Sequence, residues 1–266
     1  MQHFFTEPEN INENRVLIVG EDVNHIKNVL RMKPGEEISI SNGIDDNDYR
    51  CEIAEITDTE VICKLMFVKK AGLELPVNIV LFQGLPKNDK MELIIQKAVE
   101  LGVYEIVPVA TKRAVVKLDE KKAKSKIERW QLISEAAAKQ SKRAIVPKVS
   151  EVMNFKAAIK LASEYDVAAI PYELADGMEA TKNFVEKVVS IAEKSADKKP
   201  AFSKPNVAVF IGPEGGFDED EIKFAIDNSI NPVSLGKRIL RTETAGMTVL
   251  SILMYSLEIY GEKANV

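Results

Sequence analysis

Two glycine-bearing loops near the C-terminus have the residue types that a pocket for a small ligand needs. Each follows a short apolar run with the length of a buried strand: residues 207–211 lead to Gly212, and residues 232–235 lead to Gly236. Glycine lets the backbone turn with a positive φ and come close to another molecule. Because open parallel sheets bind ligands at the carboxyl ends of their strands, these loops predict two walls of one pocket.

Four acidic residues directly after the first loop restrict the kind of ligand. They occupy positions 218–221, and Asp218 and Glu221 have the spacing of a capping box that opens a helix over residues 219–227. These carboxylates would repel a phosphate from the helix N-terminus, where phosphates otherwise often bind. The sequence therefore argues against ATP or NAD and favours a ligand whose base and ribose are held by backbone groups.

Two sequence blocks around these loops resemble a known family. IGPEGGF starts at Ile211 and SLGKRILRTETA starts at Ser234, and together they look like the RsmE family of SPOUT-class RNA methyltransferases. The first block alone is also typical of a turn before a helix, whereas both blocks in this order make a specific match. The family uses S-adenosylmethionine (SAM) to methylate N3 of a uridine in 16S ribosomal RNA. The resemblance covers nearly the whole chain and is weakest at the extreme N-terminus and over residues 195–205.

The resemblance implies the fold class and the assembly. It implies an α/β fold with a SPOUT-type parallel sheet and a C-terminal trefoil knot, plus a small N-terminal PUA-like β-barrel that binds RNA. It also implies a homodimer. Residues 69–76 have the composition of a linker, so we predict domains over residues 1–72 and 73–266.

The resemblance also assigns the SAM site to three loops, which contact the cofactor through backbone and apolar groups. The third loop is 171–173, and it includes Glu173. Glu214 is suited to accept a hydrogen bond from a ribose hydroxyl or a ligand amine. The expected cofactor-binding residues are Pro171, Tyr172, Ile211, Gly212, Pro213, Glu214, Gly215, Ser234, Leu235, Gly236, Ile239 and Leu240.

The implied reaction needs positioning and electrostatic help more than covalent catalysis. Uridine N3 must lose its proton, so a base, or a cation that stabilises the anion on O2 or O4, would lower the barrier. Arg241 is the expected electrostatic stabiliser. Glu243 is either the base or a cap of the final helix, and both roles stay open. Because N3 lies on the Watson–Crick edge, the target must be unpaired or flipped out.

Composition favours a cytoplasmic protein with a sizeable core. The chain has 266 residues, of which 45% are hydrophobic, and no run approaches the length of a membrane span. The N-terminus lacks the pattern of a signal peptide. We expect Cys51 and Cys63 to be buried thiols rather than a disulfide. Together with His3 and His25, they offer no recognisable metal spacing, so we expect no metal.

The charge distribution points to one RNA-binding sector. The net charge is −5, but residues 111–148 contain twelve Lys or Arg and four Asp or Glu, a local balance of +8 that leaves −13 for the rest. An acidic body with one basic sector can bind RNA there through phosphates. The alternative for any one of these lysines is a solvated helix face.

The N-terminal part reads as a small β-barrel. Strands are predicted over residues 15–19, 36–41, 48–56 and 60–68, with a helix over 22–30. His25 to Arg31 matches a family pattern, H-x-x-x-V-L-R, so Arg31 is either an RNA contact or a surface arginine before a turn. Family members often carry an arginine near the start, where this chain has Gln2-His3. His3 either substitutes as a neutral donor, or the contact is missing.

The C-terminal part reads as alternating strands and helices. A strand over residues 77–82, a helix over 87–101 that ends at Gly102, and a strand over 103–109 predict a parallel β-α-β unit. Further helices are predicted over residues 119–141, 154–163, 179–194 and 242–260, a strand over 166–170, and a mobile surface loop over 195–205. The last helix is apolar around most of its circumference, which predicts burial against a partner subunit as well as its own sheet.

The expected RNA contacts combine cations with polar side chains. Near the end of the long helix, a family pattern covers Glu135, Ala136, Gln140, Ser141 and Arg143. Amides and hydroxyls can read unpaired bases, and guanidinium groups can bind phosphates. The loop over residues 83–87 is expected at the carboxyl edge of the sheet, and Lys87 and Lys90 either reach RNA from there or cap a solvated helix. The full set of expected RNA contacts is Arg31, Lys87, Arg113 with its neighbour Lys112, Gln140, Ser141 and Arg143.

Three other functions stay open at this point. A SPOUT enzyme acting on tRNA or on a ribose 2′-hydroxyl would share the fold and the cofactor. A non-catalytic RNA-binding assembly factor would keep the fold without a working SAM site. A nucleotide-phosphate enzyme is disfavoured by the acidic residues at 218–221. The expected partner is 16S ribosomal RNA within the small ribosomal subunit, although the sequence does not separate naked RNA from an assembled particle.

Overall fold

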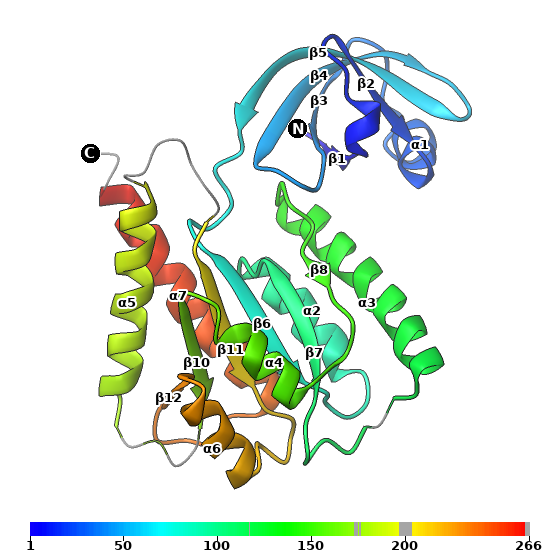
Figure 1. Ribbon diagram of the computed structural model, residues 1–266. Helices are drawn as coiled ribbons and strands as arrows, with labels where there is room; N and C mark the ends of the chain where they lie inside the picture. Colours follow the sequence, from blue (N-terminus) through cyan, green and yellow to red (C-terminus); the bar gives the residue numbers. More distant parts are fainter. Residues whose placement is uncertain (117, 173–174, 176, 197–203, 264–266) are drawn as a thin grey trace. The chain divides into compact units, whose positions relative to one another are not determined.

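A computed structural model describes residues 1–266 apart from 117, 173–174, 176, 197–203 and 264–266 (Figure 1). The chain forms two compact units. The first contains Met1–Glu74 and Ala138–Val146, and the second contains Leu75–Ala137 and Pro147–Val266. The predicted boundary at residues 72 and 73 stays a prediction, and the sequence did not indicate that residues 138–146 belong with the first unit.

The first unit is built on a five-stranded sheet that closes on itself. Strand β1 pairs in parallel with β3, the other neighbours are antiparallel, and the order is β1-β3-β4-β5-β2. The Thr6 hydroxyl, directly after β1, donates a hydrogen bond to the carbonyl of Leu17 in β2, which joins the two edges of the sheet. The strands are β1 (His3–Phe5), β2 (Arg15–Val19), β3 (Glu37–Ser41), β4 (Asn47–Ile56) and β5 (Glu60–Lys70).

Alternating apolar residues of these strands fill the interior of the first unit. Its core includes Ile18, Ile38 and Ile53, each fully buried. Two predicted boundaries shift: β5 continues to Lys70, so the linker starts later than residue 69, and the helix predicted over 22–30 is α1 (Glu21–Asn24) followed by a π-helical turn, η2 (His25–Val29). A short 3-10 helix, η1 (Pro8–Asn10), precedes β2.

The second unit contains a parallel sheet in the order β12-β10-β11-β6-β7-β8, with β9 also paired to β7. Every pairing in it is parallel, so the carboxyl ends of the strands lie along one edge. The trefoil knot stays a prediction that this order is compatible with. The strands are β6 (Asn78–Gly84), β7 (Glu105–Ala110), β8 (Lys148–Val149), β9 (Met153–Asn154), β10 (Val167–Pro171), β11 (Asn206–Ile211) and β12 (Asn231–Val233).

Helices cover both faces of this sheet (Figure 1). Helices α4 and α6 lie on one face, and α2, α5 and α7 pack together on the other. The described residues contain no helix long and apolar enough to cross a membrane. The helices are α2 (Lys90–Glu100), α3 (Glu120–Ser141), α4 (Phe155–Ala162), α5 (Glu179–Ala196), α6 (Glu219–Asp227) and α7 (Thr242–Lys263).

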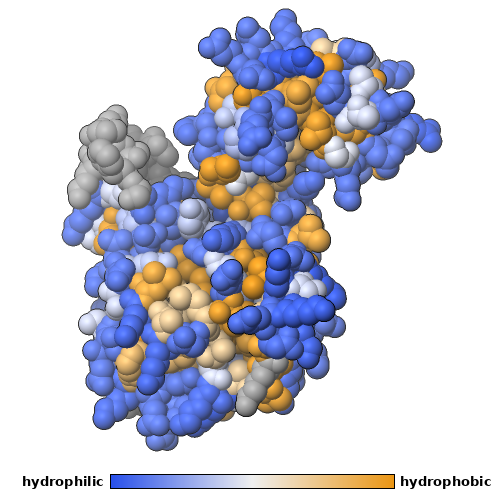
Figure 2. Space-filling model, turned by 45° about the vertical axis from the view of Figure 1, so that its right-hand side comes forward, coloured by the Kyte–Doolittle hydropathy of each residue, from blue (hydrophilic) through white to orange (hydrophobic). Residues whose placement is uncertain are grey.

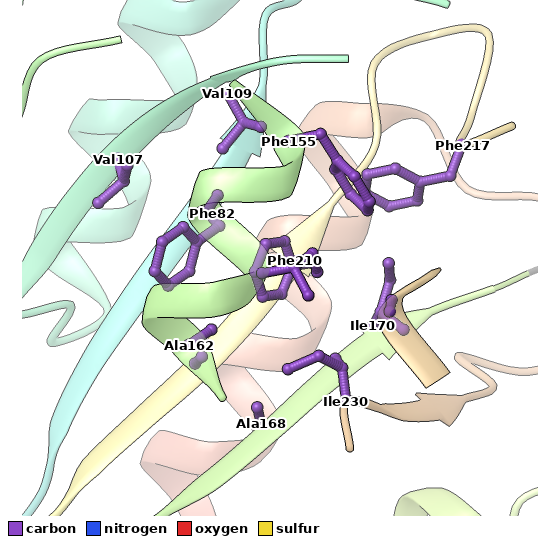
Figure 3. Close-up of a cluster of buried hydrophobic side chains, with 14 of the residues drawn as sticks. Phe82, Val107, Val109, Phe155, Ala162, Ala168, Ile170, Phe210, Phe217 and Ile230 are labelled. Atoms are coloured by element: carbon purple, nitrogen blue, oxygen red, sulfur yellow. The ribbon is translucent and has the colours of Figure 1, made fainter. Parts of the chain in front are cut away.

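A cluster of aromatic rings fixes one face of the sheet beneath the first glycine loop (Figure 3). Phe82 of β6 and Phe210 of β11 are register partners, and their rings stack with centroids 4.5 Å apart. Phe155 of α4 packs against Phe210 and also contacts Phe217, at centroid distances of 6.2 and 5.5 Å. Because Phe217 directly follows the loop, burying its ring, worth about 2 kcal/mol, anchors the loop to the core.

Helix α7 is only partly buried within one chain. Leu250, Leu253 and Leu257 are buried against the unit's interior, and Tyr255 is 66% exposed. Burial of the exposed side against a partner subunit stays a prediction. On the face of the molecule seen in Figure 2, apolar residues gather in patches within a hydrophilic surround in both units.

A buried chain of two hydrogen bonds joins β6, β11 and α7. The Gln83 side chain at the end of β6 is fully buried, and its Nε2 donates to Thr242 Oγ1 over 2.9 Å. The Thr242 hydroxyl then donates to the carbonyl of Gly212 over 2.6 Å. Three segments distant in sequence are therefore held at one point, at the first residue of α7.

Thr242→Val should lower the free energy of unfolding of the second unit by about 1–3 kcal/mol. The valine has the same shape but removes the acceptor for Gln83 and the donor for Gly212, and both groups stay buried. Trp130 is the single tryptophan, and it is buried in this unit, so denaturant unfolding followed by its fluorescence measures the loss.

Thr248→Val is the matched control. Thr248 lies on the same helix, and its hydroxyl bonds only to the Thr244 carbonyl one turn earlier, over 2.8 Å, on the exposed side. Its loss should cost less than about 0.5 kcal/mol. Equal effects of the two substitutions would contradict the role given to Thr242.

The two cysteines are free, buried thiols in the first unit. Burial raises the pKa of Cys51 and of Cys63 to about 12 each. Because the thiolate is the reactive form, we expect neither thiol to react with an aromatic disulfide reagent at pH 8 in the folded protein, and both to react in guanidinium. Rapid reaction of one thiol without denaturant would show that the interior of this unit opens.

Candidate functional site

A cavity of about 470 Å³ lies at the carboxyl edge of the parallel sheet in the second unit. Its walls are the loops after β10, β11 and β12, together with the first residues of α2 and α7. This is the place that the two glycine loops predicted, with the loop after β10 as the third wall. The lining residues are Lys90, Pro171, Tyr172, Ile211, Gly212, Pro213, Glu214, Gly215, Gly216, Phe217, Ser234, Leu235, Gly236, Arg238, Ile239, Leu240, Arg241, Thr242 and Ala245.

The pocket brings together all twelve residues predicted to bind the cofactor. Glu173, the last residue of the predicted third wall, lies outside the described residues. Arg241 also lines the pocket, with an exposed side chain, whereas Glu243 is not among the lining residues. The structure therefore separates the two predicted catalytic residues: Arg241 lines the pocket and Glu243 does not.

Gly212 in the first loop and Gly84 at the end of β6 are needed for close packing and not for a positive φ. A Cβ on Gly212 would lie 3.2 Å from the Cα of Gly216, and one on Gly84 would lie 2.7 Å from the backbone nitrogen of Pro213. Positive φ values occur instead at Gly216 (+65°) and Gly236 (+107°). Side chains at these positions would push the loops apart or strain them, so backbone atoms form much of the wall.

Charged residues fix the far end of the first loop. Helix α6 opens with the predicted capping box, in which Asp218 and Glu221 accept backbone N–H groups. Glu221 also accepts the backbone N–H of Lys112 over 2.8 Å, and Lys112 Nζ lies 2.7 Å from Asp218. The hydrogen bond from Lys112 lowers the pKa of Asp218, which keeps that carboxylate charged. The acidic residues thus hold neighbouring protein groups instead of a ligand.

Arg113 also contacts the first glycine loop and the start of α6. Its Nε lies 3.4 Å from Asp218, its Nη1 donates to the carbonyl of Gly215 over 3.4 Å, and its side chain packs on Gly215. Lys112 and Arg113 were predicted to face RNA. In the structure both remain exposed on one side, while their charges are partly neutralised by the loop that they brace.

A second charged group lies at the opposite wall. Lys90 Nζ is 3.2 Å from Glu214 and 3.3 Å from Glu243. Both oxygens of Glu214 also accept the backbone N–H of Lys87, over 3.1 and 3.2 Å. Partial burial alone would raise the pKa of Glu214, but these hydrogen bonds from backbone amides and Lys90 hold it below its usual value. The sequence did not indicate this contact, because the three residues are far apart along the chain.

The other predicted RNA contacts differ in accessibility. Arg31 is exposed and has a φ of 53°, in the left-handed region. Lys87 and Gln140 are exposed, and Ser141 is half-buried, with its hydroxyl 3.4 Å from the Ala138 carbonyl. These positions leave the polar groups of Arg31, Lys87 and Gln140 accessible to a large ligand.

Arg143 is a predicted RNA contact that the structure buries. Its side chain is 5% exposed and forms a buried ion pair with Glu74, whose side chain is 4% exposed. Both guanidinium Nε and Nη2 bond to that carboxylate, which also accepts the backbone N–H of Ile145. The guanidinium is therefore not accessible to a large ligand in this structure, and an RNA contact by Arg143 stays an untested prediction. The ion pair therefore links the two segments of the first unit, residues 1–74 and 138–146.

His3 occupies a polar network inside the first unit. Its Nδ1 lies 3.1 Å from Ser39 Oγ, and Ser39 donates to the buried carboxylate of Asp48 over 2.6 Å. Burial lowers the pKa of His3, so the ring is neutral at pH 7. The second ring nitrogen is buried without a partner among the described residues. Among the same residues, no three side chains are grouped as metal ligands.

Comparisons with known proteins match two successive stretches of the chain. A family model described as "RNA methyltransferase domain" matches residues 73–254, and one described as "RNA methyltransferase PUA domain" matches residues 18–66. The chain is 36% identical over 262 residues to "Ribosomal RNA small subunit methyltransferase E" of Bacillus subtilis, covering 97% of this chain and 98% of the relative. A protein of the same name from Mesomycoplasma hyopneumoniae is 32% identical, covering 94% and 98%.

Solved structures agree with these relatives. The crystal structure of a ribosomal RNA small subunit methyltransferase E from Neisseria gonorrhoeae bound to S-adenosyl methionine matches with a TM-score of 0.77 at 28% identity, over 96% of this chain and 97% of the other. A putative methyltransferase from Legionella pneumophila, in complex with SAM, matches with a TM-score of 0.77 at 29% identity over the same shares. The chain belongs to the RsmE family of RNA methyltransferases.

Proposed function

We propose that this protein transfers a methyl group from SAM to N3 of a uridine in 16S ribosomal RNA of the small subunit. The observation that carries the proposal is the single pocket in which both family blocks meet, with Arg241 on its wall. The relatives named ribosomal RNA small subunit methyltransferase E support the substrate class. We place the protein in the cytoplasm, where ribosomal RNA is methylated.

SAM fits the chemistry of the pocket. The twelve predicted residues supply backbone N–H and C=O groups and apolar side chains, which suit an adenine and a ribose. Glu214 already accepts hydrogen bonds from Lys87 and Lys90, yet a carboxylate has further lone pairs for a ribose hydroxyl. Bound SAM supplies an electrophilic methyl on a sulfonium, and the protein supplies its orientation.

Arg241 is the proposed electrostatic stabiliser. When uridine N3 loses its proton, negative charge spreads to O2 and O4, and a guanidinium on the pocket wall stabilises it before the methyl group arrives. Glu243 is the second candidate of the sequence analysis. Its place in the first turn of α7, outside the pocket lining, favours the role of a helix-end carboxylate over that of a base.

The remaining parts of the proposal concern assembly. We place RNA binding in a PUA-like domain over residues 1–72 and catalysis in a SPOUT domain over residues 73–266. Arg31, Lys87 and Gln140 are the proposed RNA contacts that are most accessible. We also propose a homodimer, because Tyr255 of α7 is 66% exposed on a helix that is apolar around most of its circumference. The trefoil knot is part of this proposal.

Two other functions make different predictions. A SPOUT enzyme for tRNA or for a ribose 2′-hydroxyl would yield another methylated nucleoside. An RNA-binding assembly factor would bind no SAM. The complete pocket lining, including Arg241, favours an enzyme over the assembly factor.

Small-subunit particles lacking the modification should gain 3-methyluridine when incubated with the protein and labelled SAM. Arg241→Ala should lower the rate about 10²–10³-fold, because it removes one preorganised stabiliser of the anion. Digestion to nucleosides and mass analysis identifies the product. Lys182→Ala, which removes an exposed cation of α5 with a weak ion pair to Glu186 and outside the pocket lining, is the control and should transfer normally.

A different methylated nucleoside would reject the uridine N3 assignment, and the assignments of fold and cofactor would stand. SAM binding without transfer to particles, naked 16S RNA or tRNA would reject the catalytic proposal. A wild-type rate for Arg241→Ala would reject Arg241 as the stabiliser while leaving the reaction in place.

Light scattering in solution should give a mass of twice the 29.6 kDa of one chain. Tyr255→Lys should shift the mass toward one chain, because it places a charge on the exposed strip of α7. Tyr104→Lys, at another exposed tyrosine outside α7, is the matched control and should leave the mass unchanged. A single-chain mass for the wild type would reject the homodimer.

A further inference from the structure

Lys90 is a charged residue of the pocket wall that lies outside both family blocks. It is the first residue of α2, more than 120 positions before Glu214, and it lines the pocket with a side chain that is 28% exposed. The sequence offered only an RNA contact or a solvated helix end for it. Its contacts favour a different role, and the inference drawn from them rests on the proposed function.

The position of Lys90 is unfavourable unless something holds it there. A cation at the N-terminus of a helix lies near the positive end of the helix dipole, which disfavours it. Glu214 at 3.2 Å and Glu243 at 3.3 Å offset this effect. The hydrogen bond to Glu214 raises the pKa of Lys90, so the ammonium is charged at every physiological pH. The two carboxylates thus keep a cation where the helix alone would not.

The ammonium has capacity left for a ligand. A lysine has three N–H donors, and Glu214 takes one of them over 3.2 Å. Glu243 Oε2 is buried and receives no hydrogen bond of good geometry among the described residues, although Lys90 lies 3.3 Å away. Glu243 therefore acts on Lys90 through charge. Because Glu243 does not line the pocket and Lys90 does, Lys90 is the group that the pair presents to a ligand.

We propose that Lys90 is a fixed cation of the reaction pocket that binds an anionic oxygen of the bound reactants, with Glu214 and Glu243 as its positioning residues. Two reactants carry such an oxygen: the uridine anion, at O2 or O4, and SAM, at its carboxylate. In the reaction, N3 loses its proton to solvent, the sulfonium–methyl bond breaks, the N3–methyl bond forms, and S-adenosylhomocysteine leaves. Lys90 keeps its proton throughout.

Lys90→Met removes the charge and keeps most of the side-chain length. If Lys90 binds the uridine anion, kcat should fall about 10–100-fold and the Kd for SAM should stay unchanged. In a plot of kcat against pH, the rising limb should move to higher pH. The limb moves because N3 ionises less readily without the cation. The charged groups in contact with Lys90 are Glu214 and Glu243, the other charged residues of the pocket lining are Arg238 and Arg241, and all four are unchanged.

If Lys90 binds the SAM carboxylate, the Kd for SAM measured by calorimetry should rise about 10–100-fold, and kcat at saturating SAM should stay. Methylthioadenosine, which lacks the carboxylate, should then bind the wild type and the variant equally. Lys90→Arg keeps the charge and should recover part of the loss in either case. Lys97→Met is the control, since Lys97 lies on the same helix and pairs with Glu100 at the surface.

Glu243→Gln separates positioning from base catalysis. The amide keeps the shape of the side chain and loses its charge, while Lys90 keeps its own charge and its contact with Glu214. The effect on kcat should therefore be smaller than that of Lys90→Met. A larger effect would overturn the positioning role of Glu243 and favour the base.

Values of kcat, Kd and pH profile within twofold of the wild type for a folded Lys90→Met would overturn the role of Lys90. A wild type that methylates no RNA would count against the proposed function instead. In that case an unchanged Kd for SAM in Lys90→Met would overturn this inference as well.

Discussion

The site depends on one buried hydroxyl, that of Thr242. It accepts from Gln83 at the end of β6 and donates to Gly212 at the end of β11, and it opens α7 directly after the second glycine loop. The loops over residues 211–216 and 234–240 are apart in the chain, and they form one pocket only if the strand and helix that carry them are fixed to each other. A buried hydrogen bond does this well, because neither partner finds water when the bond breaks. Arg241 precedes Thr242, so its position follows from the same bond.

The parts of this site that sequence reasoning found are those with local chemistry. Glycines that permit close packing, a capping box at Asp218 and Glu221, and apolar runs before the loops all act within a few residues. The carboxyl ends of parallel strands then place the loops along one edge without further information. Even here the reason for Gly212 differed: it is required by the nearness of Gly216, a packing fact, and not by a positive φ.

The parts that sequence reasoning missed are pairings across long separations. A lysine at the start of a helix, such as Lys90, has the same local pattern whether it meets solvent or two carboxylates. Arg143 fitted an RNA-facing family pattern, yet Glu74 buries it, and Lys112 and Arg113 brace the first loop. Charge type is visible in a sequence, whereas the partner that neutralises the charge is set by the tertiary fold. The tertiary partner of a charged residue is therefore harder to predict from sequence than the packing role of a glycine loop.

This internal pairing changes how the basic sector should be understood. Of its twelve cations, six form ion pairs within the described residues: Lys112, Arg113, Lys122, Arg129, Lys139 and Arg143. A paired cation contributes less to the field that attracts phosphates, so the effective charge of the sector is well below +8. Fewer phosphate contacts mean a weaker sequence-independent attraction to RNA. Selection of one uridine must then rest on the shape of the RNA and on capture of an unpaired base in the pocket, which suits a folded ribosomal target better than an arbitrary strand.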